Sequence, residues 1–320
     1  MATSSPTLVA CTDLSRNSLA ALRHAAWLSS SLGYQVRLIF VVDPGTVLPH
    51  KKRNGAEQHE ALAQWAKSQL ELLRQKIFTD ATVEAAVIEL PGRAIWGELT
   101  KPYDNHAVAQ AICEAAKASR ADLIVLGTHG HAGLSELVLG TVAMRVMRLA
   151  PCDVLTVRPV GAESPDAPLD LETLPSPSAE PMVRRMLCAV DFSEGSRLAL
   201  NRAVALAKLT GAELHLLHSY RVPFWMGPGS SEMEGQLATQ VADSLEQLAN
   251  DHRGSGVTIT CHTSTGRAPM QIRDLAEQLR ADWIVMGALG QTALDELLVG
   301  SVTERVVRIA SSPVLAVRNR

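Results

Sequence analysis

The sequence has no surplus of either charge and no apolar run long enough to cross a bilayer. Its 320 residues carry 30 Lys and Arg against 33 Asp and Glu, a formal net charge of −3. A chain so close to neutral creates no strong overall field that would attract nucleic acid or an anionic membrane. No stretch reaches the roughly 18 consecutive apolar residues of a membrane-spanning helix, and the start, MATSSPTLVACTD, lacks the features of a secretory signal. We therefore expect a soluble chain with neither a nucleic-acid nor a membrane partner.

Cysteine is also scarce. The five cysteines are scattered, and none forms a C-x-x-C pair or a Cys/His cluster at the spacing of a zinc site. They are Cys11, Cys113, Cys152, Cys188 and Cys261. This pattern predicts free, mostly buried thiols, no metal centre and a reducing compartment, which we take to be the cytoplasm.

The common signatures of hydrolytic chemistry are missing. The sequence contains no G-x-x-x-x-G-K-[ST], no G-x-S-x-G and no H-E-x-x-H, so it supplies neither a P-loop lysine nor a recognisable nucleophile or metalloprotease motif. We identify no catalytic residue, and we expect a site that holds a ligand, with slow hydrolysis at most.

What the sequence does contain is an internal repeat. The stretch GTHGHAGLSELVLGT begins at Gly127, and GALGQTALDELLVGS begins 160 positions later at Gly287. Both follow the pattern G-x-x-G-x(9)-G-[ST]. Near the start of each copy an Asp-x-Ser also repeats, with Asp13 matching Asp191 at an offset of 178. The first copy is longer, mainly because the segment Ile95–Ala107 has no counterpart; this segment is a lid, a partner surface or an elongated loop without a role.

The segment between the copies, Gly161–Pro181, has five prolines, five acidic residues and no Lys or Arg. Such a composition favours an extended linker. We therefore predict one domain over residues 1–160, a linker over 161–181 and a second domain over 182–320.

Within each copy, short apolar runs alternate with longer helical patterns, which is typical of parallel strands joined by crossover helices. The strands expected in the first copy are Leu8–Cys11, Val36–Val42, Val83–Ile88, Leu123–Leu126 and Val154–Val157. The continuous apolar run VRLIFVV suits a sheet that is covered on both faces. We predict two tandem doubly wound α/β domains, each with a five-stranded parallel sheet.

In such sheets, ligands bind outside the carboxyl ends of the strands. Gly127 and Gly287 directly follow the fourth strands, and Thr141 or Ser301 stands where a helix is expected to begin. A helix start presents unpaired N–H groups and suits a phosphate. Alternatively, the hydroxyl only caps the helix. The same two readings, ligand contact or capping, apply to Asp13 and Asp191. The helix itself is expected to bury the stripe Val142, Val146 and Leu149, or Val302, Val306 and Ile309.

The glycine pattern, the helix with R-V-x-R, the strand A-P-C-x-V-L-x-V-R and the Asp-x-Ser together resemble the universal stress protein family. The resemblance covers nearly the whole chain twice, as in a tandem member. It implies an adenine nucleotide alpha hydrolase-like fold with strand order 3-2-1-4-5, a stress-response role, and ATP at the glycine loop, alone or with magnesium.

By position, the resemblance implies two sets of nucleotide-binding residues. The first set is Thr12, Asp13, Val41, Gly127, His129, Gly130, Gly140, Thr141 and Val142. The second set is Val190, Asp191, Ser219, Gly287, Gly290, Gly300, Ser301 and Val302. Leu289 replaces His129 and Ser219 replaces Val41, so we rank the first site above the second.

The last apolar strand of each copy lies in Asp153–Arg158 or Pro313–Arg318. Unpaired edge strands invite partners, and in the resembled family these strands mediate dimerisation. We expect the two domains to pair through them within one chain, with any homodimer built from other surfaces such as Ile95–Ala107. The leading functional hypothesis is a nucleotide-binding sensor or regulator. The alternatives are a nucleotide-independent interaction scaffold and an enzyme acting on an adenylate.

Overall fold

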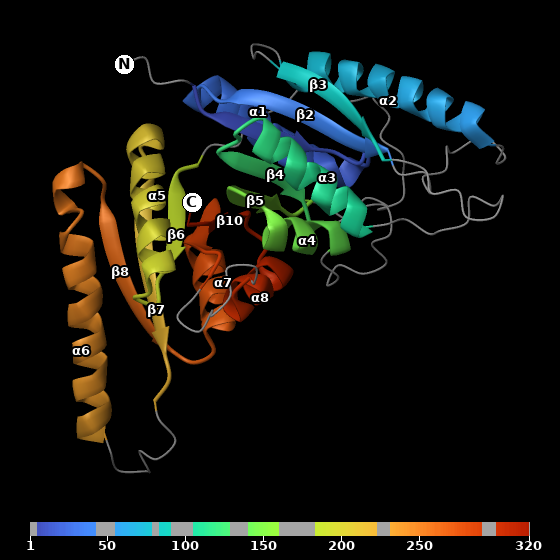
Figure 1. Cartoon of the computed structure of the whole chain (residues 1–320). Helices are drawn as coiled ribbons and strands as arrows, with labels where there is room; N and C mark the ends of the chain where they lie inside the picture. The colour runs from blue at the N-terminus through green and yellow to red at the C-terminus, as the bar shows by residue number, and fades with distance from the viewer. Residues whose placement is uncertain are drawn as a thin grey trace. The chain divides into compact units, whose positions relative to one another are not determined.

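The fold is described from a computed structural model of the chain (Figure 1). The described residues are 5–42, 55–78, 83–90, 105–128, 140–159, 183–222, 231–289 and 299–319. Internal contacts divide the chain into two compact units, Met1–Pro181 and Met182–Arg320. Gly161–Pro181, His129, Gly130, Gly290 and most of Ile95–Ala107 lie outside the described residues.

The first unit alternates strands and helices along the chain. Its elements are β1 (Thr7–Cys11), the short 3-10 helix η1 (Arg16–Ser18), α1 (Leu19–Leu32), β2 (Gln35–Val42), α2 (Gly55–Ile77), β3 (Val83–Glu89), α3 (Asn105–Ala118), β4 (Leu123–Gly127), α4 (Thr141–Leu149) and β5 (Asp153–Val157). The five strands expected from the sequence are all present, within one residue at each end.

The second unit repeats this alternation. Its elements are β6 (Arg185–Ala189), α5 (Glu194–Thr210), β7 (Glu213–Tyr220), α6 (Ser231–Asn250), η2 (Arg253–Ser255), β8 (Ile259–Thr265), α7 (Ala268–Leu279), β9 (Trp283–Gly287), α8 (Ser301–Ile309) and β10 (Val314–Val317). Helices α1 and α5 both end at a glycine with a left-handed backbone, Gly33 with φ 70° and Gly211 with φ 71°. A residue without a Cβ adopts this conformation at no steric cost.

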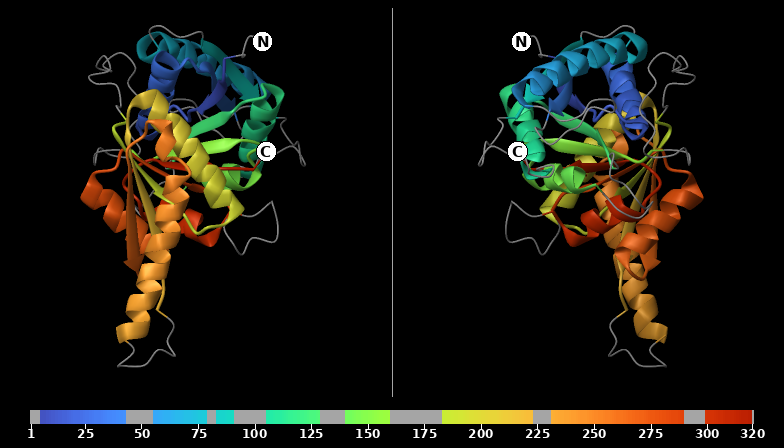
Figure 2. Two further views of the ribbon diagram at one scale, coloured as in Figure 1. Left: turned by 90° about the vertical axis from the view of Figure 1, so that its left-hand side faces the viewer. Right: turned by 90° about the vertical axis from the view of Figure 1, so that its right-hand side faces the viewer.

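Within each unit the strands are parallel and have the same order. The first unit has β3-β2-β1-β4-β5 and the second has β8-β7-β6-β9-β10. Helices lie on both sides of the strands (Figures 1 and 2), and α3 contacts α4 while α7 contacts α8. Right-handed crossovers produce this arrangement when the winding reverses after the third strand. The predicted fold class is confirmed.

The strands form the core of each unit. Leu8, Leu38 and Ile124 in the first unit, and Met186 and Trp283 in the second, are among the largest fully buried side chains. Continuous burial along β4 and β9 agrees with the expectation of sheets covered on both faces.

The repeated Arg-Ala-Asp before the fourth strands joins the sheet to the preceding helix at the amino ends of the strands. Arg120 and Arg280 have left-handed φ angles of 48° and 50°. The carboxylate of Asp282 then accepts hydrogen bonds from the backbone N–H groups of Arg184 and Arg185 at 2.7 and 2.9 Å. In the first unit Asp122 accepts one from Thr7 at 2.9 Å. This repeated motif is structural and lies at the end of the sheet opposite the candidate site.

The buried face of α4 differs from the predicted stripe. Val146 is fully buried, but Leu149 is 38% exposed, and Ala143, Met144 and Met147 are buried in its place. In α8, Val302 is 36% exposed while Thr303, Val306 and Val307 are buried. The prediction was wrong here because α4 packs on α3 and α8 packs on α7, so the buried face of each helix is shifted to one side of the apolar stripe. The segment Ile95–Ala107 ends inside a helix, since α3 begins at Asn105.

All five cysteines are free, and four are buried. Burial raises the pKa of the Cys188 thiol to about 12 and moves the pKa of Cys11 far above its usual range. Burial is also the main reason why the pKa of Cys261 rises to about 12. These thiols are protonated near neutral pH and are poor nucleophiles, as expected of structural cysteines.

Candidate functional site

The Asp-x-Ser motif forms a tight turn directly after the first strand of each unit. In the first unit, Ser15 donates its backbone N–H and its hydroxyl to Oδ1 of Asp13 at 3.0 and 2.5 Å. In the second unit, Ser193 makes the same two bonds to Asp191 at 3.1 and 2.5 Å. The aspartates therefore have a local structural role. The capping alternative holds in a modified form: the serine stands at the N-cap position, and the aspartate binds the serine.

The residue between Asp and Ser has an unusual backbone conformation in both turns. Leu14 has φ 59° and Phe192 has φ 65°. Left-handed angles are uncommon for bulky side chains and cluster at functional sites. The conformation folds the chain back so that the serine reaches the carboxylate, and it holds the end of the strand in one geometry.

Thr12 uses its side chain inside this turn. Its hydroxyl lies 2.8 Å from the Ser18 hydroxyl and accepts a hydrogen bond from the N–H of Leu14 at 3.0 Å. Its own N–H donates to the carbonyl of Ile39 at 3.1 Å and extends the sheet by one residue. In this geometry any contact of Thr12 with a ligand runs through its backbone.

The two ends of the glycine loop lie side by side. The N–H of Gly140 donates to the carbonyl of Thr128 at 2.7 Å, and the N–H of Gly300 donates to the carbonyl of Ala288 at 2.7 Å. In the second unit, Thr303 also donates its hydroxyl to the carbonyl of Gly287 at 2.7 Å. The loop thus leaves the sheet and returns to the same point, which places the start of α4 or α8 beside the end of β4 or β9.

Glycine, and not the hydroxyl residue, is the N-cap of these helices. Gly140 has φ −56° and ψ 134°, Gly300 has φ −58° and ψ 137°, and neither helix start has a capping side chain. Thr141 and Ser301 are the first helical residues and are exposed. The alternative in which these hydroxyls cap the helix is therefore wrong. The first intrahelical bond of α4 comes from the N–H of Met144, so the N–H groups of the three preceding residues point out of the helix end.

The second strands bring different side chains to the two units. Val41 is 7% exposed near the end of β2. Ser219 takes its place in β7, beside Ser264 of β8 in the register. Both serine hydroxyl oxygens are buried and have no hydrogen-bond partner among the described residues. A buried hydroxyl is a poorer surface for an apolar group than valine is.

Sequence reasoning missed the role of His218 in the second unit. Its Nδ1 lies 2.8 Å from the carbonyl oxygen of Val190, and its ring lies 4.5 Å from the ring of Phe192, centroid to centroid. In the first unit the corresponding residue is Phe40, which is buried and has no ring nitrogen. The repeat offset of 178 pairs Phe40 with His218, but nothing in the sequence indicates that the imidazole bonds a backbone carbonyl.

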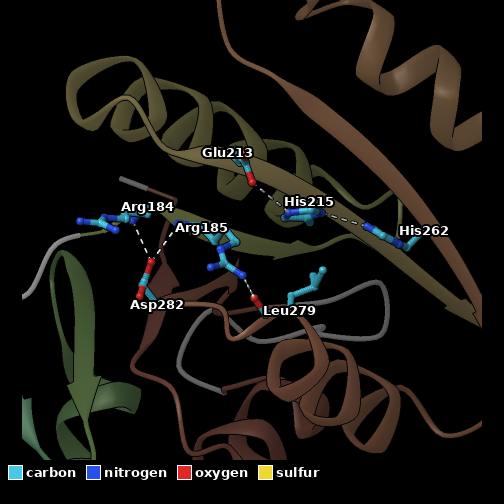
Figure 3. A network of polar contacts seen from close by, with 7 residues as sticks. All are labelled: Arg184, Arg185, Glu213, His215, His262, Leu279 and Asp282. Carbon is cyan, nitrogen blue, oxygen red and sulfur yellow. Dashed lines mark hydrogen bonds and ion pairs between the residues drawn. The ribbon is translucent and has the colours of Figure 1, made fainter.

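A second polar cluster lies on the sheet of the second unit, toward the amino ends of β6 and β7 (Figure 3). The ring nitrogens His215 Nδ1 and His262 Nε2, on neighbouring strands, are 3.0 Å apart, and Glu213 lies 4.0 Å from His215 Nε2. Burial lowers the pKa of both histidines, and the neighbouring His215 lowers that of His262 further. Arg185 donates to the carbonyl of Leu279 at 2.5 Å in the same view.

The part of the chain that the structure describes contains no helix with both the length and the apolar character needed to cross a bilayer.

Comparison with known proteins bears out the resemblance. The sequence model of the universal stress protein family matches residues 6–158 and 182–318. A universal stress protein of Mycolicibacterium smegmatis is 26% identical over 309 residues, which are 96% of this chain and 95% of that protein. Universal stress protein MJ0531 of Methanocaldococcus jannaschii is 31% identical over 145 residues, which are 44% of this chain and 85% of that protein.

The fold has a solved counterpart of similar length. The crystal structure of a universal stress protein from Archaeoglobus fulgidus DSM 4304 aligns with a TM-score of 0.65 and 21% identity, over 98% of this chain and 96% of that chain. At this identity the likeness concerns the fold alone. The two stretches matched by the family model cover most of the sequence, and the chain therefore belongs to the universal stress protein family.

Proposed function

We propose that this protein is a cytoplasmic stress-response sensor or regulator that binds ATP or a related adenine nucleotide. One observation carries the proposal. In each unit the turn after the first strand, the end of the fourth strand and a glycine-capped helix start lie at the same edge of the sheet. Family membership makes an adenine nucleotide the first ligand to test at this edge.

The helix starts are suited to the phosphates. Gly140 and Gly300 have no side chain to cover the N–H groups of the first turn, and Thr141 or Ser301 adds an exposed hydroxyl. Unpaired N–H groups and the positive end of the helix dipole favour an anion. Magnesium would accompany ATP through the phosphates. When bound, ATP would supply charge and a base for the protein to recognise.

The first unit is proposed as the better site. In the second unit, His218 already bonds the carbonyl of Val190, and buried Ser219 replaces Val41. An adenine base that entered the second site would meet the polar side chains of His218 and Ser219, and the carbonyl of Val190 would already accept a hydrogen bond. In the first unit the residues that match His218 and Ser219 are the apolar Phe40 and Val41, which favours a flat ring.

The proposal is tested on the purified full chain. Denaturing the protein and separating the supernatant by chromatography should release an adenine nucleotide that absorbs near 260 nm, and calorimetry should detect ATP binding to nucleotide-free protein. A chain that carries no nucleotide and gives no heat with ATP, ADP or AMP would instead support the nucleotide-independent scaffold.

A further inference from the structure

Asn17 is a buried side chain in the turn after β1, and its amide nitrogen has no hydrogen-bond partner among the described residues. It lies in η1, between β1 and α1, and is 7% exposed. Its amide nitrogen Nδ2 is buried and makes no hydrogen bond within the part of the chain that the structure describes. An unpaired buried donor is destabilising, so a buried amide of this kind calls for a partner.

The side chains around Asn17 are already paired with one another. Ser18 donates its hydroxyl to the carbonyl of Ser15 at 2.8 Å, and its oxygen lies 2.8 Å from the Thr12 hydroxyl. Ser15 bonds the carboxylate of Asp13. The turn therefore holds itself together without Asn17, whose amide contributes none of these bonds.

The second unit has glycine at the same position of the repeat, because Gly195 is 178 residues beyond Asn17. A Cβ on Gly195 would lie 2.6 Å from the carbonyl oxygen of Leu289, and a Cβ on Gly287 would lie 2.8 Å from the carbonyl carbon of Gly195. The start of the glycine loop thus rests directly on the backbone at the start of α5. No side chain fits between them.

The repeat places the Asn17 amide in the matching space of the first unit. Gly127 corresponds to Gly287 at the offset of 160, and η1 contacts β4, the strand that Gly127 ends. Where the second unit brings two backbones into contact, the first unit has an amide with two N–H donors. This difference gives the first unit a side-chain donor near the fourth strand.

We infer that Asn17 is a ligand-binding residue of the first unit, whose amide donates a hydrogen bond to an acceptor oxygen of the bound nucleotide. The inference rests on the proposed function. The acceptor is a phosphate or a ribose oxygen, since these are the oxygens that a nucleotide offers near the carboxyl ends of β1 and β4. Asn17 then distinguishes the two sites of the chain, because the second unit has no equivalent donor.

Calorimetry on the full chain with ATP, AMP and adenosine tests the inference. Asn17→Ala should weaken ATP binding about tenfold or more, the effect of losing one hydrogen bond to a charged group. Asn17→Asp should weaken it further, because it replaces the donor by a negative charge. If the acceptor is a phosphate, the loss disappears with adenosine; if it is a ribose oxygen, the loss persists. The matched control is Asn201→Ala, an exposed asparagine on α5, which should bind like the unmodified chain.

Two further readouts separate a ligand contact from a structural role. The unfolding midpoint of ligand-free Asn17→Ala should stay close to that of the unmodified chain, since Asn17 Nδ2 makes no hydrogen bond among the described residues. Hydrogen exchange should show ATP protecting the peptide around Asn17 in the unmodified chain and not in the variant. Equal ATP affinity of the unmodified and Asn17→Ala chains would overturn the inference alone. No ATP binding by the unmodified chain would overturn the proposed function, and the inference with it.

Discussion

Single side chains decide how each strand end is shaped. Leu14 and Phe192 hold left-handed backbone angles, and each following serine binds the preceding aspartate. The turn is followed by different residues in the two units. The first unit has the side-chain amide of Asn17, and the second has Gly195, which has no side chain. Gly195 and the pair of His215 and His262, all in the second unit, each lead to a prediction at this scale.

Gly195 is predicted to be intolerant of even one added carbon. Gly195→Ala puts a methyl group 2.6 Å from a backbone oxygen that cannot rotate away. We expect a loss of about 1–3 kcal/mol in the free energy of unfolding, typical of overpacking. Hydrogen exchange should show faster opening of β9 in the second unit and no change of β4 in the first.

The control for this substitution is Gly235→Ala on α6, where an added Cβ meets no atom within 4 Å. Alanine favours a helix over glycine by roughly 0.5–1 kcal/mol, so this variant should be as stable as the unmodified chain or slightly more. Equal stability of the two alanine variants would show that the loop does not rest on Gly195.

The histidine pair predicts acid sensitivity of the second unit. The hydrogen bond between His215 and His262 needs one acceptor nitrogen, so it is lost when both rings are protonated. The charges acting on the pair are Glu213, which raises the pKa of His215, and Arg185, which lowers it. Helix α7, which packs on β7, carries an ion pair between two of its own residues, Arg273 and Asp274.

The sign of the pH effect follows from the lowered pKa of both histidines. The unfolded chain takes up protons near the ordinary pKa of about 6.5, whereas the folded chain resists them until lower pH. Stability is therefore fully present above about pH 6.5 and is lost as the pH falls through the lower folded values. The midpoint of urea unfolding should drop between pH 7 and pH 5. His262→Gln, whose amide stays neutral, should reduce that drop, and an unchanged slope would argue against the pair.

At the scale of secondary-structure elements, the starts of α4 and α8 are equivalent in geometry and differ in surroundings. Their glycine N-caps have φ angles near −60°, which any residue can adopt. Substitution of either glycine should therefore leave the helix folded.

Nucleotide binding should respond more strongly at the first helix. A bulky side chain in Gly140→Trp would cover the N–H groups of the first turn and abolish ATP binding to the first unit. Gly300→Trp should have a smaller effect, because the second site is the weaker one. Calorimetry in which Gly300→Trp causes the larger loss would reverse the proposed ranking.

The hydrogen bonds between Asp282, which precedes β9, and the start of β6 give a prediction that concerns stability alone. Asp282→Ala removes the acceptor for two backbone N–H groups at the start of β6, and we expect about 1–3 kcal/mol of destabilisation from the lost charged hydrogen bonds. Asp122→Ala, which removes one such bond in the first unit, should cost less. Both variants should keep their ATP affinity, since these carboxylates lie at the opposite end of the sheet from the site. Weaker ATP binding by either would contradict the structural role.

For the whole molecule, the pairing of the two domains through Asp153–Arg158 and Pro313–Arg318 stays a prediction. The linker of 21 residues reaches on the order of 65 Å at roughly 3.1 Å per residue, and tethering raises the effective concentration of each edge. After proteolytic cleavage of the linker, the halves should remain together on gel filtration. Halves that separate at once, with unchanged stability, would show that these strands are not the interface.

The sequence by itself determined the class of the fold, the five strands of the first unit and the repeat that relates it to the second. These features depend on periodicity and on short-range patterns, such as the apolar run Val36–Val42, which needs cover on both faces whatever surrounds it. The sequence likewise predicted correctly that a helix begins at Thr141, where α4 starts. The identity of the capping residue was predicted less well, because Gly140 and Thr141 are adjacent and both are compatible with a helix start.

Only the tertiary structure decided which polar groups find a hydrogen-bond partner within the protein and which do not. The hydroxyl of Thr12, the imidazole of His218 and the amide of Asn17 are equally polar in the sequence. In the fold, the first two bond neighbouring strands or turns, and the amide nitrogen of Asn17 is buried without a hydrogen-bond partner among the described residues. Such pairing depends on distances between residues far apart in the chain, which packing sets and local pattern does not.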